Sequence, residues 1–312
     1  MSTGYRVAIV GGTGRLGTYI VDILVSEYRT QFPIVRVLTR DPTSDTARNL
    51  QAKGAELHMF DEANVDGSLA TALSGVDVVV NALPSATTPT MRLELLQSTA
   101  ITSGARVYFL SEFGVDHRQN DFPGYDHHEW AVKRELAEDA RTRAAGNLKI
   151  VAVYSGLFLE GAFRAFAGYD LENNTYSCVG SPAQRIAFTS TADIGRTVAE
   201  LACLALDPET ASHVGVAVRI AGTVVSYEDV RDMVAKIKGL ERGAISTGDL
   251  WNKKRELQEQ GGQASVLEYI RVLMGEGKLD FSGDNVNELV NPRGTRWRWK
   301  SAYDQLETQL LS

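Results

Sequence analysis

Long apolar runs are missing from the 312-residue sequence, and none approaches the roughly 18 residues that a membrane-spanning helix requires. The N-terminus leads directly into a predicted strand, so we expect no signal peptide. Internal repeats, low-complexity linkers and blocks of like charge are absent as well. These absences favour a cytoplasmic globular protein over a membrane or secreted one.

Cysteine is scarce, which argues against a disulfide framework or a cysteine-rich metal site. Cys178 and Cys203 are the only two, and their spacing fits neither a metal-binding motif nor a redox motif. We therefore expect two reduced cysteines, as is usual for a cytosolic protein.

Positive charge is in deficit, with 32 lysines and arginines against 39 aspartates and glutamates and a net charge of −7. An acidic chain is a poor partner for nucleic acid or an anionic membrane. Cations do alternate with Trp297 and Trp299, but this pattern indicates a strand with one solvated face. The composition, 44% hydrophobic and 23% charged, is typical of a soluble globular protein. The sequence does not decide the oligomeric state, and a monomer or a homodimer would both fit.

The N-terminal stretch Tyr5–Gly17, YRVAIVGGTGRLG, has the most informative pattern in the chain. A short β-branched run ends in glycines, and a helical pattern follows, which is the context that a dinucleotide-binding turn requires. Gly12-x-Gly14-x-x-Gly17 fits one spacing of the fingerprint and Gly11-x-x-Gly14-x-x-Gly17 fits a wider one. In either spacing, free N–H groups at the helix start face the phosphates of a bound dinucleotide.

Apolar runs alternate with helical patterns through the first half of the chain, which predicts a doubly wound parallel sheet of the Rossmann type. The predicted strands are 6–10, 34–39, 55–59, 76–81, 105–110 and 148–154, and the predicted helices are 15–29, 44–53, 66–73, 89–103 and 127–145. Ligands of such sheets bind beyond the carboxyl ends of the strands, so we expect the chemistry there.

The end of the second predicted strand decides between NAD and NADP. An NAD-binding unit usually carries an acidic residue there, whereas this chain offers Thr39 and Arg40. A guanidinium suits the 2′-phosphate of NADP, so we predict NADPH. Asp41 complicates this prediction, since it could cap a helix or accept a ribose hydroxyl.

The fourth and fifth strands end in Asn81-Ala82-Leu83 and in Ser111-Glu112-Phe113. Small and rigid residues after the fourth strand suit a backbone that passes close to a cofactor, although a plain turn closed by Pro84 explains them equally well. The segment after the fifth strand is expected at the nicotinamide end.

A predicted helix then carries Lys133, but no tyrosine stands four residues before it, as it would in a Tyr-x-x-x-Lys reductase pair. Lys133 could act as a general acid or base, or it could be a surface lysine of an amphipathic helix. Because His127 and His128 are adjacent and have no third ligand nearby, they are expected to be solvated or capping rather than metal-binding.

The parallel-sheet rhythm ends at Ser155. Phe158, Phe163, Phe166 and Tyr169 follow at near-helical spacing, which fits a packed amphipathic face or an aromatic wall for a flat substrate. Further along, we expect a helix over 227–238 that is capped by Ser226.

In combination, GGTGRLG at 11–17, VLTRDP at 37–42, SEFG at 111–114, the Lys133 helix and SGLFLEGAF at 155–163 resemble the NmrA-like, isoflavone-reductase-like branch of atypical short-chain dehydrogenases/reductases. The resemblance extends over the whole chain. It implies an NADP-binding Rossmann domain over 1–155 and a smaller α/β substrate domain over 156–312, partly intertwined with the first.

The resemblance also implies functional residues. Lys133 matches the lysine that serves as the catalytic acid/base of the family's reductases, and Arg40 matches the residue that takes the 2′-phosphate. The cofactor site is expected to comprise Gly11, Thr13, Gly14, Arg15, Leu16, Gly17, Arg40, Asn81, Ala82, Leu83, Ser111, Glu112, Phe113 and Lys133. The substrate site is expected to comprise Phe113, Tyr125, Ser155, Phe158, Phe163 and Tyr169.

The chain departs from the family pattern in the loop over 115–125 and at Ser155-Gly156-Leu157-Phe158, so the substrate of the plant enzymes cannot be carried over. We expect an NADPH-dependent reductase of a small aromatic specialised metabolite, with an enone, benzylic ether, ketone or imine as the reduced group. Two alternatives stay open: an NmrA-type dinucleotide-sensing regulator, and a cyclase or isomerase that keeps NADP without net redox chemistry.

Overall fold

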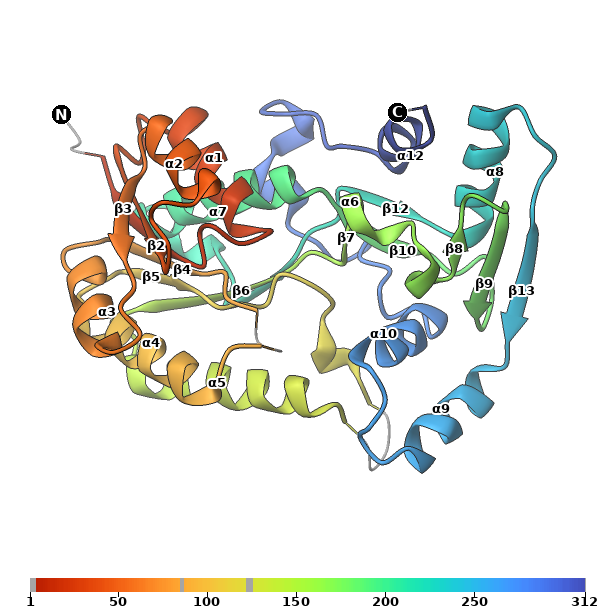
Figure 1. Ribbon diagram of the computed structural model, residues 1–312, viewed down its shortest axis with the longest axis horizontal. Coiled ribbons are helices and arrows are strands. Elements are labelled where there is room, and N and C mark those ends of the chain that lie inside the picture. The colour runs from red at the N-terminus through yellow and green to blue at the C-terminus, as the bar shows by residue number, and fades with distance from the viewer. Residues whose placement is uncertain (1–3, 85–86, 122–125, 312) are drawn as a thin grey trace. The chain divides into compact units, whose positions relative to one another are not determined.

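A computed structural model of the chain describes residues 4–84, 87–121 and 126–311 (Figure 1). The contacts between residues divide the chain into two units. The first unit takes in the chain through Glu112, Val132–Val153 and Ile194–Val218. The second unit takes in Phe113–Ala131, Tyr154–Asp193 and the chain from Arg219 onward. Each unit is therefore assembled from separate segments of the sequence.

A seven-stranded sheet forms the centre of the first unit, in the order β11-β6-β5-β4-β1-β2-β3. Its strands are β1 (Arg6–Val10), β2 (Ile34–Thr39), β3 (Glu56–Met59), β4 (Val78–Asn81), β5 (Val107–Phe109), β6 (Lys149–Tyr154) and β11 (Ala217–Arg219). The pairings among β1 to β6 are parallel. This order and these pairings are those of a Rossmann-like doubly wound sheet, as the sequence predicts.

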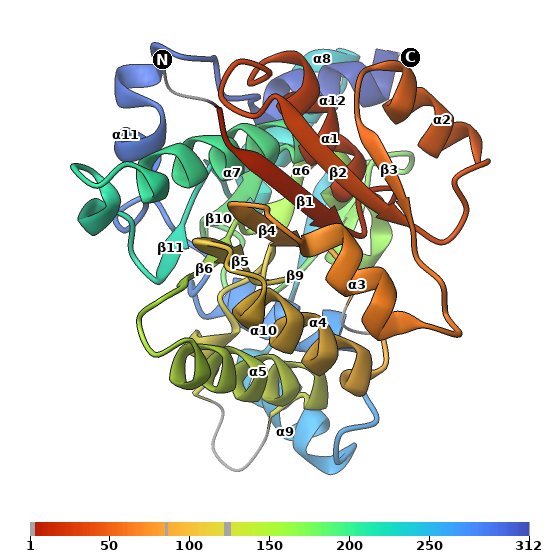
Figure 2. The same ribbon diagram turned by 90° about the vertical axis from the view of Figure 1, so that its left-hand side faces the viewer.

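Helices cover both faces of this sheet, as Figures 1 and 2 show, with α1 and α7 on one face and α3, α4 and α5 on the other. The helices of this half are α1 (Gly17–Ser26), α2 (Asp45–Ala52), α3 (Val65–Leu73), α4 (Thr90–Thr102), α5 (His128–Ala144) and α7 (Thr191–Leu206). Because both faces are covered, the central strands are apolar throughout: Val78, Val79 and Val80 are fully buried.

The predicted elements of the first half are all present. Most of the observed elements are slightly shorter than predicted, because regular backbone pairing stops before the apolar run does. The largest difference is at the first helix, which begins at Gly17 rather than residue 15 and ends at Ser26 rather than 29. The two residues before Gly17, Arg15 and Leu16, belong to the glycine turn instead.

The second unit contains two small sheets. In one, β10 (Ile186–Thr189) lies between β7 (Leu157–Phe158) and β12 (Thr223–Val225). In the other, β9 (Thr175–Val179) lies between β8 (Tyr169–Asp170) and β13 (Ala244–Gly248). Its helices are α6 (Leu159–Ala162), α8 (Tyr227–Lys238), α9 (Leu250–Glu259), α10 (Val266–Gly275), α11 (Asn287–Val290) and α12 (Ala302–Leu311).

Helix α8 has the bounds that the sequence predicts, because its cap is strong. Ser226 Oγ accepts a hydrogen bond from the Asp229 N–H, and the Asp229 carboxylate accepts one from the Ser226 N–H. This reciprocal capping box satisfies two N–H groups that the helix itself leaves unpaired.

In the second half, one spacing pattern does not correspond to a helix, and one predicted strand does not form. The near-helical spacing of Phe158 to Tyr169 does not form one helix, since β7, the short α6, a 3₁₀ turn and β8 follow one another there. Gly168, whose φ is +84°, turns the chain into β8. The region of Trp297 and Trp299 is not a strand either: it lacks regular secondary structure, and the two indole rings contact each other edge to face with centroids 5.1 Å apart.

None of the helices within residues 4–84, 87–121 and 126–311 combines the length and the apolar character that crossing a membrane would demand.

Candidate active site

The glycine turn between β1 and α1 is tightly folded. Gly11 has a φ of +85°, and a Cβ at this position would lie 2.8 Å from the Ala82 carbonyl oxygen. The Gly14 N–H donates to the Gly11 carbonyl at 2.9 Å, and the Gly14 carbonyl accepts from the Thr18 N–H at 3.0 Å. The turn therefore requires glycine at position 11, where β1 and the segment after β4 come closest.

Gly17 opens α1 and packs directly against the turn. A Cβ at Gly17 would lie 2.1 Å from the Gly11 carbonyl oxygen, which no side chain tolerates. Gly12 is also tight, since a Cβ there would meet Val37 of β2 at 2.9 Å. Both glycine spacings in the sequence thus correspond to real packing constraints, and the wider one includes Gly11, whose positive φ only glycine adopts readily.

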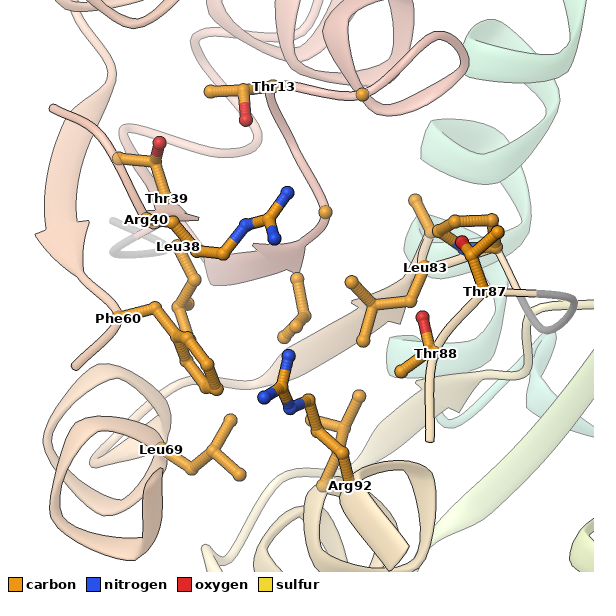
Figure 3. Close-up of a pocket in the computed structure, with 16 residues that line it drawn as sticks. Thr13, Leu38, Thr39, Arg40, Phe60, Leu69, Leu83, Thr87, Thr88 and Arg92 are labelled. Carbon is orange, nitrogen blue, oxygen red and sulfur yellow. The ribbon is translucent and has the colours of Figure 1, made fainter. Parts of the chain in front are cut away.

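A pocket with a volume of about 310 Å³ lies beside this turn (Figure 3). It is lined by Val10, Gly11, Thr13, Gly14, Leu38, Thr39, Arg40, Phe60, Leu69, Ala82, Leu83, Pro84, Thr87, Thr88, Arg92 and Leu96. Six of the predicted cofactor residues, Gly11, Thr13, Gly14, Arg40, Ala82 and Leu83, are among them. Arg15 is exposed and Leu16 is buried beside the turn, and neither lines the pocket.

Two guanidinium groups face the pocket, and the sequence analysis found only one of them. Figure 3 shows Arg40 and Arg92 pointing toward its middle from different sides. The Arg92 guanidinium carbon lies 5.2 Å from the ring centroid of Phe60, a cation–π distance. Arg92 is on α4, far from Arg40 in the sequence, and no motif singles it out. Glu62 lies 3.4 Å from Arg92 and 3.9 Å from Arg40.

Asp41 is engaged in its own backbone turn. Its Oδ1 accepts hydrogen bonds from the Thr43 N–H at 2.8 Å and from the Thr43 hydroxyl at 2.6 Å. These bonds, the side-chain one foremost, lower the pKa of Asp41. The residue that caps α2 is Ser44, whose Oγ accepts from the Ala47 N–H. Asp41 therefore does not cap α2, and its Oδ1 is already bonded to Thr43.

The segment after β4 is fixed from two sides. Asn81 Oδ1 accepts from the Leu83 N–H at 3.1 Å, and the Asn81 amide nitrogen lies 3.3 Å from the Tyr108 hydroxyl. Burial raises the pKa of Tyr108, which favours the neutral phenol. The Ser111 hydroxyl donates to the Leu83 carbonyl at 2.6 Å. Asn81, Leu83 and Ser111 therefore form one connected edge at the carboxyl ends of β4 and β5.

Lys133 reaches this edge from α5. Its ammonium donates a hydrogen bond of 2.7 Å to the Ser111 carbonyl and lies 3.4 Å from Glu112 Oε2. The Glu112 side chain is buried, at 3% exposure, while that of Lys133 retains 21%. The Lys133 ammonium is therefore held by two groups at the end of β5, and its side chain is only partly exposed.

The paired histidines differ from each other. His127 is buried, and its Nδ1 accepts a hydrogen bond of 3.3 Å from the Glu129 N–H at the start of α5. Burial lowers the pKa of His127. His128 is exposed. Of the two expected roles, His127 therefore has the capping one and His128 the solvated one.

The predicted substrate residues of the second unit fall into two groups. Phe163 and Tyr169, each 1% exposed, pack edge to face with ring centroids 5.3 Å apart, which favours the packing interpretation for both. Ser155 and Phe113 are also buried, whereas Phe158 is half-buried. Tyr125 lies outside the described residues.

The first unit meets the physical requirements of a dinucleotide site. Without side chains at Gly11 and Gly17 the turn can form, α1 begins directly behind it, and two guanidinium groups face the adjoining pocket. Backbone N–H groups at a helix start and guanidinium groups are the donors that phosphates prefer in proteins. The residues present therefore fit NADP.

Comparison with known proteins supports this interpretation. The model of the NmrA-like family matches residues 3–245. The chain is 26% identical over 294 residues to a protein of Aspergillus flavus named oxidoreductase aprR, which covers 92% of this chain and 94% of the relative. It is 30% identical over 131 residues to probable pinoresinol-lariciresinol reductase 3 of Arabidopsis thaliana, or 42% of this chain and 41% of that one.

Among solved structures, AtPrR2 with NADP+ and (+)pinoresinol is similar to the chain. The two share a TM-score of 0.78 at 18% identity, over 99% of each chain. At this level of identity the likeness establishes a common fold.

Proposed function

The chain belongs to the NmrA-like family, and on that premise we propose that it is an NADPH-dependent oxidoreductase that reduces a small aromatic substrate. One observation carries the proposal. The first unit by itself holds a pocket of the dinucleotide-binding type beside the glycine turn. It also holds Lys133, whose ammonium is fixed at the carboxyl ends of the parallel strands. The curated relative aprR is named an oxidoreductase, and AtPrR2 was solved with NADP+, which supports the same reaction class.

We assign the phosphates of NADPH to the glycine turn and the start of α1. Gly11, Thr13 and Gly14 line the pocket there. The 2′-phosphate is assigned to Arg40, which is 76% exposed in its side chain and so has room to close on an anion. A planar guanidinium binds a phosphate through two parallel hydrogen bonds, which favours NADPH over NADH.

NADPH, when bound, supplies a hydride. Lys133 is proposed to supply the matching proton. Hydride addition would leave the electron pair of the reduced bond on a carbonyl oxygen, on an imine nitrogen or on the leaving oxygen of a benzylic ether. The Lys133 ammonium would donate its proton to that atom and would recover a proton from water. General acid catalysis of this kind contributes about 10²- to 10⁴-fold in rate.

The Ser111 carbonyl and the Glu112 carboxylate hold the ammonium in place for this step. Both groups accept hydrogen bonds from the Lys133 ammonium. Neither a backbone carbonyl nor an ionised carboxylate has a proton to donate, so neither can replace the lysine as the acid. Fixing the donor before the substrate arrives lowers the entropic cost of the reaction.

The aromatic character of the substrate rests on the relatives. AtPrR2 was solved with pinoresinol, and the Arabidopsis relative is named for pinoresinol and lariciresinol. We propose that the first unit binds the cofactor. Phe113 and Phe158 stay candidate substrate-binding residues. An enone, a benzylic ether, a ketone and an imine are the candidate groups.

NADPH consumption by the purified protein, measured against a panel of aryl enones, quinones, imines and benzylic ethers, tests the proposal. Turnover with any member would support a reductase and identify the reactive group. Tight NADPH binding together with product formation that oxidises no NADPH would indicate an isomerase or a cyclase instead. Tight binding, no product from any substrate class and a nucleotide-dependent protein complex would indicate a regulator.

A further inference from the structure

The two guanidinium groups of the pocket share one partner, Glu62. A single carboxylate oxygen of Glu62, Oε1, lies 3.4 Å from Arg92 Nη1 and 3.9 Å from Arg40 Nη1. Arg40 follows β2, Glu62 follows β3, and Arg92 is on α4. Three separate elements of the first unit thus bring two cations and one anion together beside the pocket.

This arrangement is loose, and it is open to water. The side chains of Glu62 and Arg40 are 56% and 76% exposed, while that of Arg92 is 28% exposed. Both distances exceed the roughly 2.7–2.9 Å of a strong charge-assisted hydrogen bond. Exposed pairs of this kind contribute little to stability. Stability therefore does not explain why an anion lies between these two arginines.

Arg92 is the better fixed of the two cations. Its guanidinium lies over Phe60, at 5.2 Å, and it lines the pocket together with Arg40. Figure 3 shows both guanidinium groups directed into the same space. Two convergent guanidinium groups attract an anion with more than one negative charge more strongly than a single carboxylate, because each pair interaction scales with the charges involved.

We infer that Glu62 is a built-in counter-anion of the Arg40–Arg92 pair, which the 2′-phosphate of the cofactor must displace, and that Glu62 thereby sets the affinity for phosphorylated against unphosphorylated nucleotides. This inference rests on the proposed NADPH site. Glu62 neutralises the pair when no nucleotide is bound, and it repels the phosphate dianion as the nucleotide approaches. The Glu62 carboxylate therefore lowers the affinity for nucleotides that carry a 2′-phosphate, and it leaves the affinity for nucleotides without one unchanged.

The experiment compares adenosine 2′,5′-bisphosphate with 5′-AMP, two probes that differ by the 2′-phosphate alone and that require no substrate. Dissociation constants are measured by calorimetry for the wild type and for Glu62→Gln, which keeps the shape of the side chain and removes its charge. Asp66→Asn is the charge-matched control, because Asp66 is an exposed acid in the first turn of α3.

Glu62→Gln is expected to bind the bisphosphate about 3- to 10-fold more tightly at low salt, with 5′-AMP changed less than about 2-fold. Asp66→Asn is expected to leave both affinities near the wild-type values. In an Arg92→Ala background the gain from Glu62→Gln shrinks, because one of the two cations that Glu62 neutralises is gone.

Provided that the wild type binds the bisphosphate, three results would overturn the inference. Glu62→Gln could gain affinity equally for both nucleotides, it could gain no affinity at all, or Asp66→Asn could gain as much affinity as Glu62→Gln. Failure of the wild type to bind either nucleotide would overturn the proposed cofactor site as well. The two failures are therefore distinguishable in one set of titrations.

Discussion

The ammonium of Lys133 donates a 2.7 Å hydrogen bond to the backbone carbonyl of Ser111. This contact links the first half of α5 to the residue that follows β5 by two positions, at the edge where ligands of a doubly wound sheet bind. Because the acceptor is a backbone atom, the lysine position depends on the sheet and not on the identity of residue 111. The chain thus fixes an ammonium group at the carboxyl edge, where the common short-chain reductases place a tyrosine beside their lysine, and we propose that this ammonium is the proton donor.

Replacing Lys133 by alanine is expected to lower kcat about 10²- to 10⁴-fold, because the proton donor is lost. The dissociation constant for NADPH, measured by fluorescence titration, should stay within a few-fold of the wild-type value. Lys53→Ala is the matched control, since Lys53 is a half-exposed lysine that pairs with Asp22. An unchanged kcat in Lys133→Ala would remove this residue from the mechanism.

Arg40→Leu is expected to weaken NADPH binding about 10-fold while NADH binding changes little, because only the 2′-phosphate loses a partner. Parallel titrations of both cofactors measure the change in preference. Arg143→Leu, which removes an exposed cation of α5, controls for the change in net charge. A loss of affinity that is equal for the two cofactors would contradict the assignment of Arg40 to the 2′-phosphate.

Gly17→Ala is expected to reduce the free energy of unfolding by about 2 kcal/mol or more, because its Cβ would lie 2.1 Å from the Gly11 carbonyl oxygen, which belongs to the backbone. Denaturant titration measures the effect. Gly283→Ala is the control, since a Cβ there meets no atom within 4 Å. Equal stabilities of the two variants would show that the turn is less constrained than described.

Asp116 gives the second unit an acid-sensitive contribution to stability. It is fully buried, and its carboxylate accepts hydrogen bonds from Arg118 at 2.7 Å and from Arg219 at 2.7 Å. Burial acts to raise the pKa of Asp116, but the two guanidinium groups outweigh it and lower the pKa. A carboxyl whose pKa is lower when folded stabilises the protein above the pKa of the unfolded state, about 3.9, and loses this effect as the pH falls through the folded value.

Asp116→Asn is accordingly expected to cost about 2 kcal/mol of unfolding free energy at neutral pH, because both cations lose a charged partner. The difference from the wild type should shrink as the pH falls below about 4, where the carboxyl of the unfolded chain becomes protonated, and should be lost once the pH has fallen through the lower pKa of the folded state. Asp284→Asn, which removes an 82% exposed partner of the same Arg219, serves as the control and should cost much less. A difference that stays constant from neutral to acid pH would refute the charge-based account.

The sequence predicts the first unit well because its constraints are local. The glycines of the first turn stand within seven residues of one another, and each buried strand is a short apolar run between helical patterns. Lys133 is singled out by the family resemblance and not by its position alone, and its catalytic role stays a prediction. Its partners Ser111 and Glu112 emerge only from the folded chain.

The remaining features depend on contacts between distant residues. Arg92 and Glu62 come together with Arg40 only in the folded chain, from α4, the segment after β3 and the segment after β2, and no spacing in the sequence encodes this. Phe163 and Tyr169 mimic a helical face, yet they meet edge to face in the core after the chain has turned. Spacing alone cannot distinguish these cases, because the turn at Gly168 breaks the periodicity.

The central claim is that the protein transfers a hydride from bound NADPH to its substrate. Turnover of the substrate identified from the panel, with NADPH that carries deuterium at the transferred position of the nicotinamide, tests it most directly. The account predicts one deuterium on the reduced carbon of the product, by mass spectrometry, and one NADP+ formed per product. Product that carries no deuterium, formed without oxidation of the cofactor, would contradict the account.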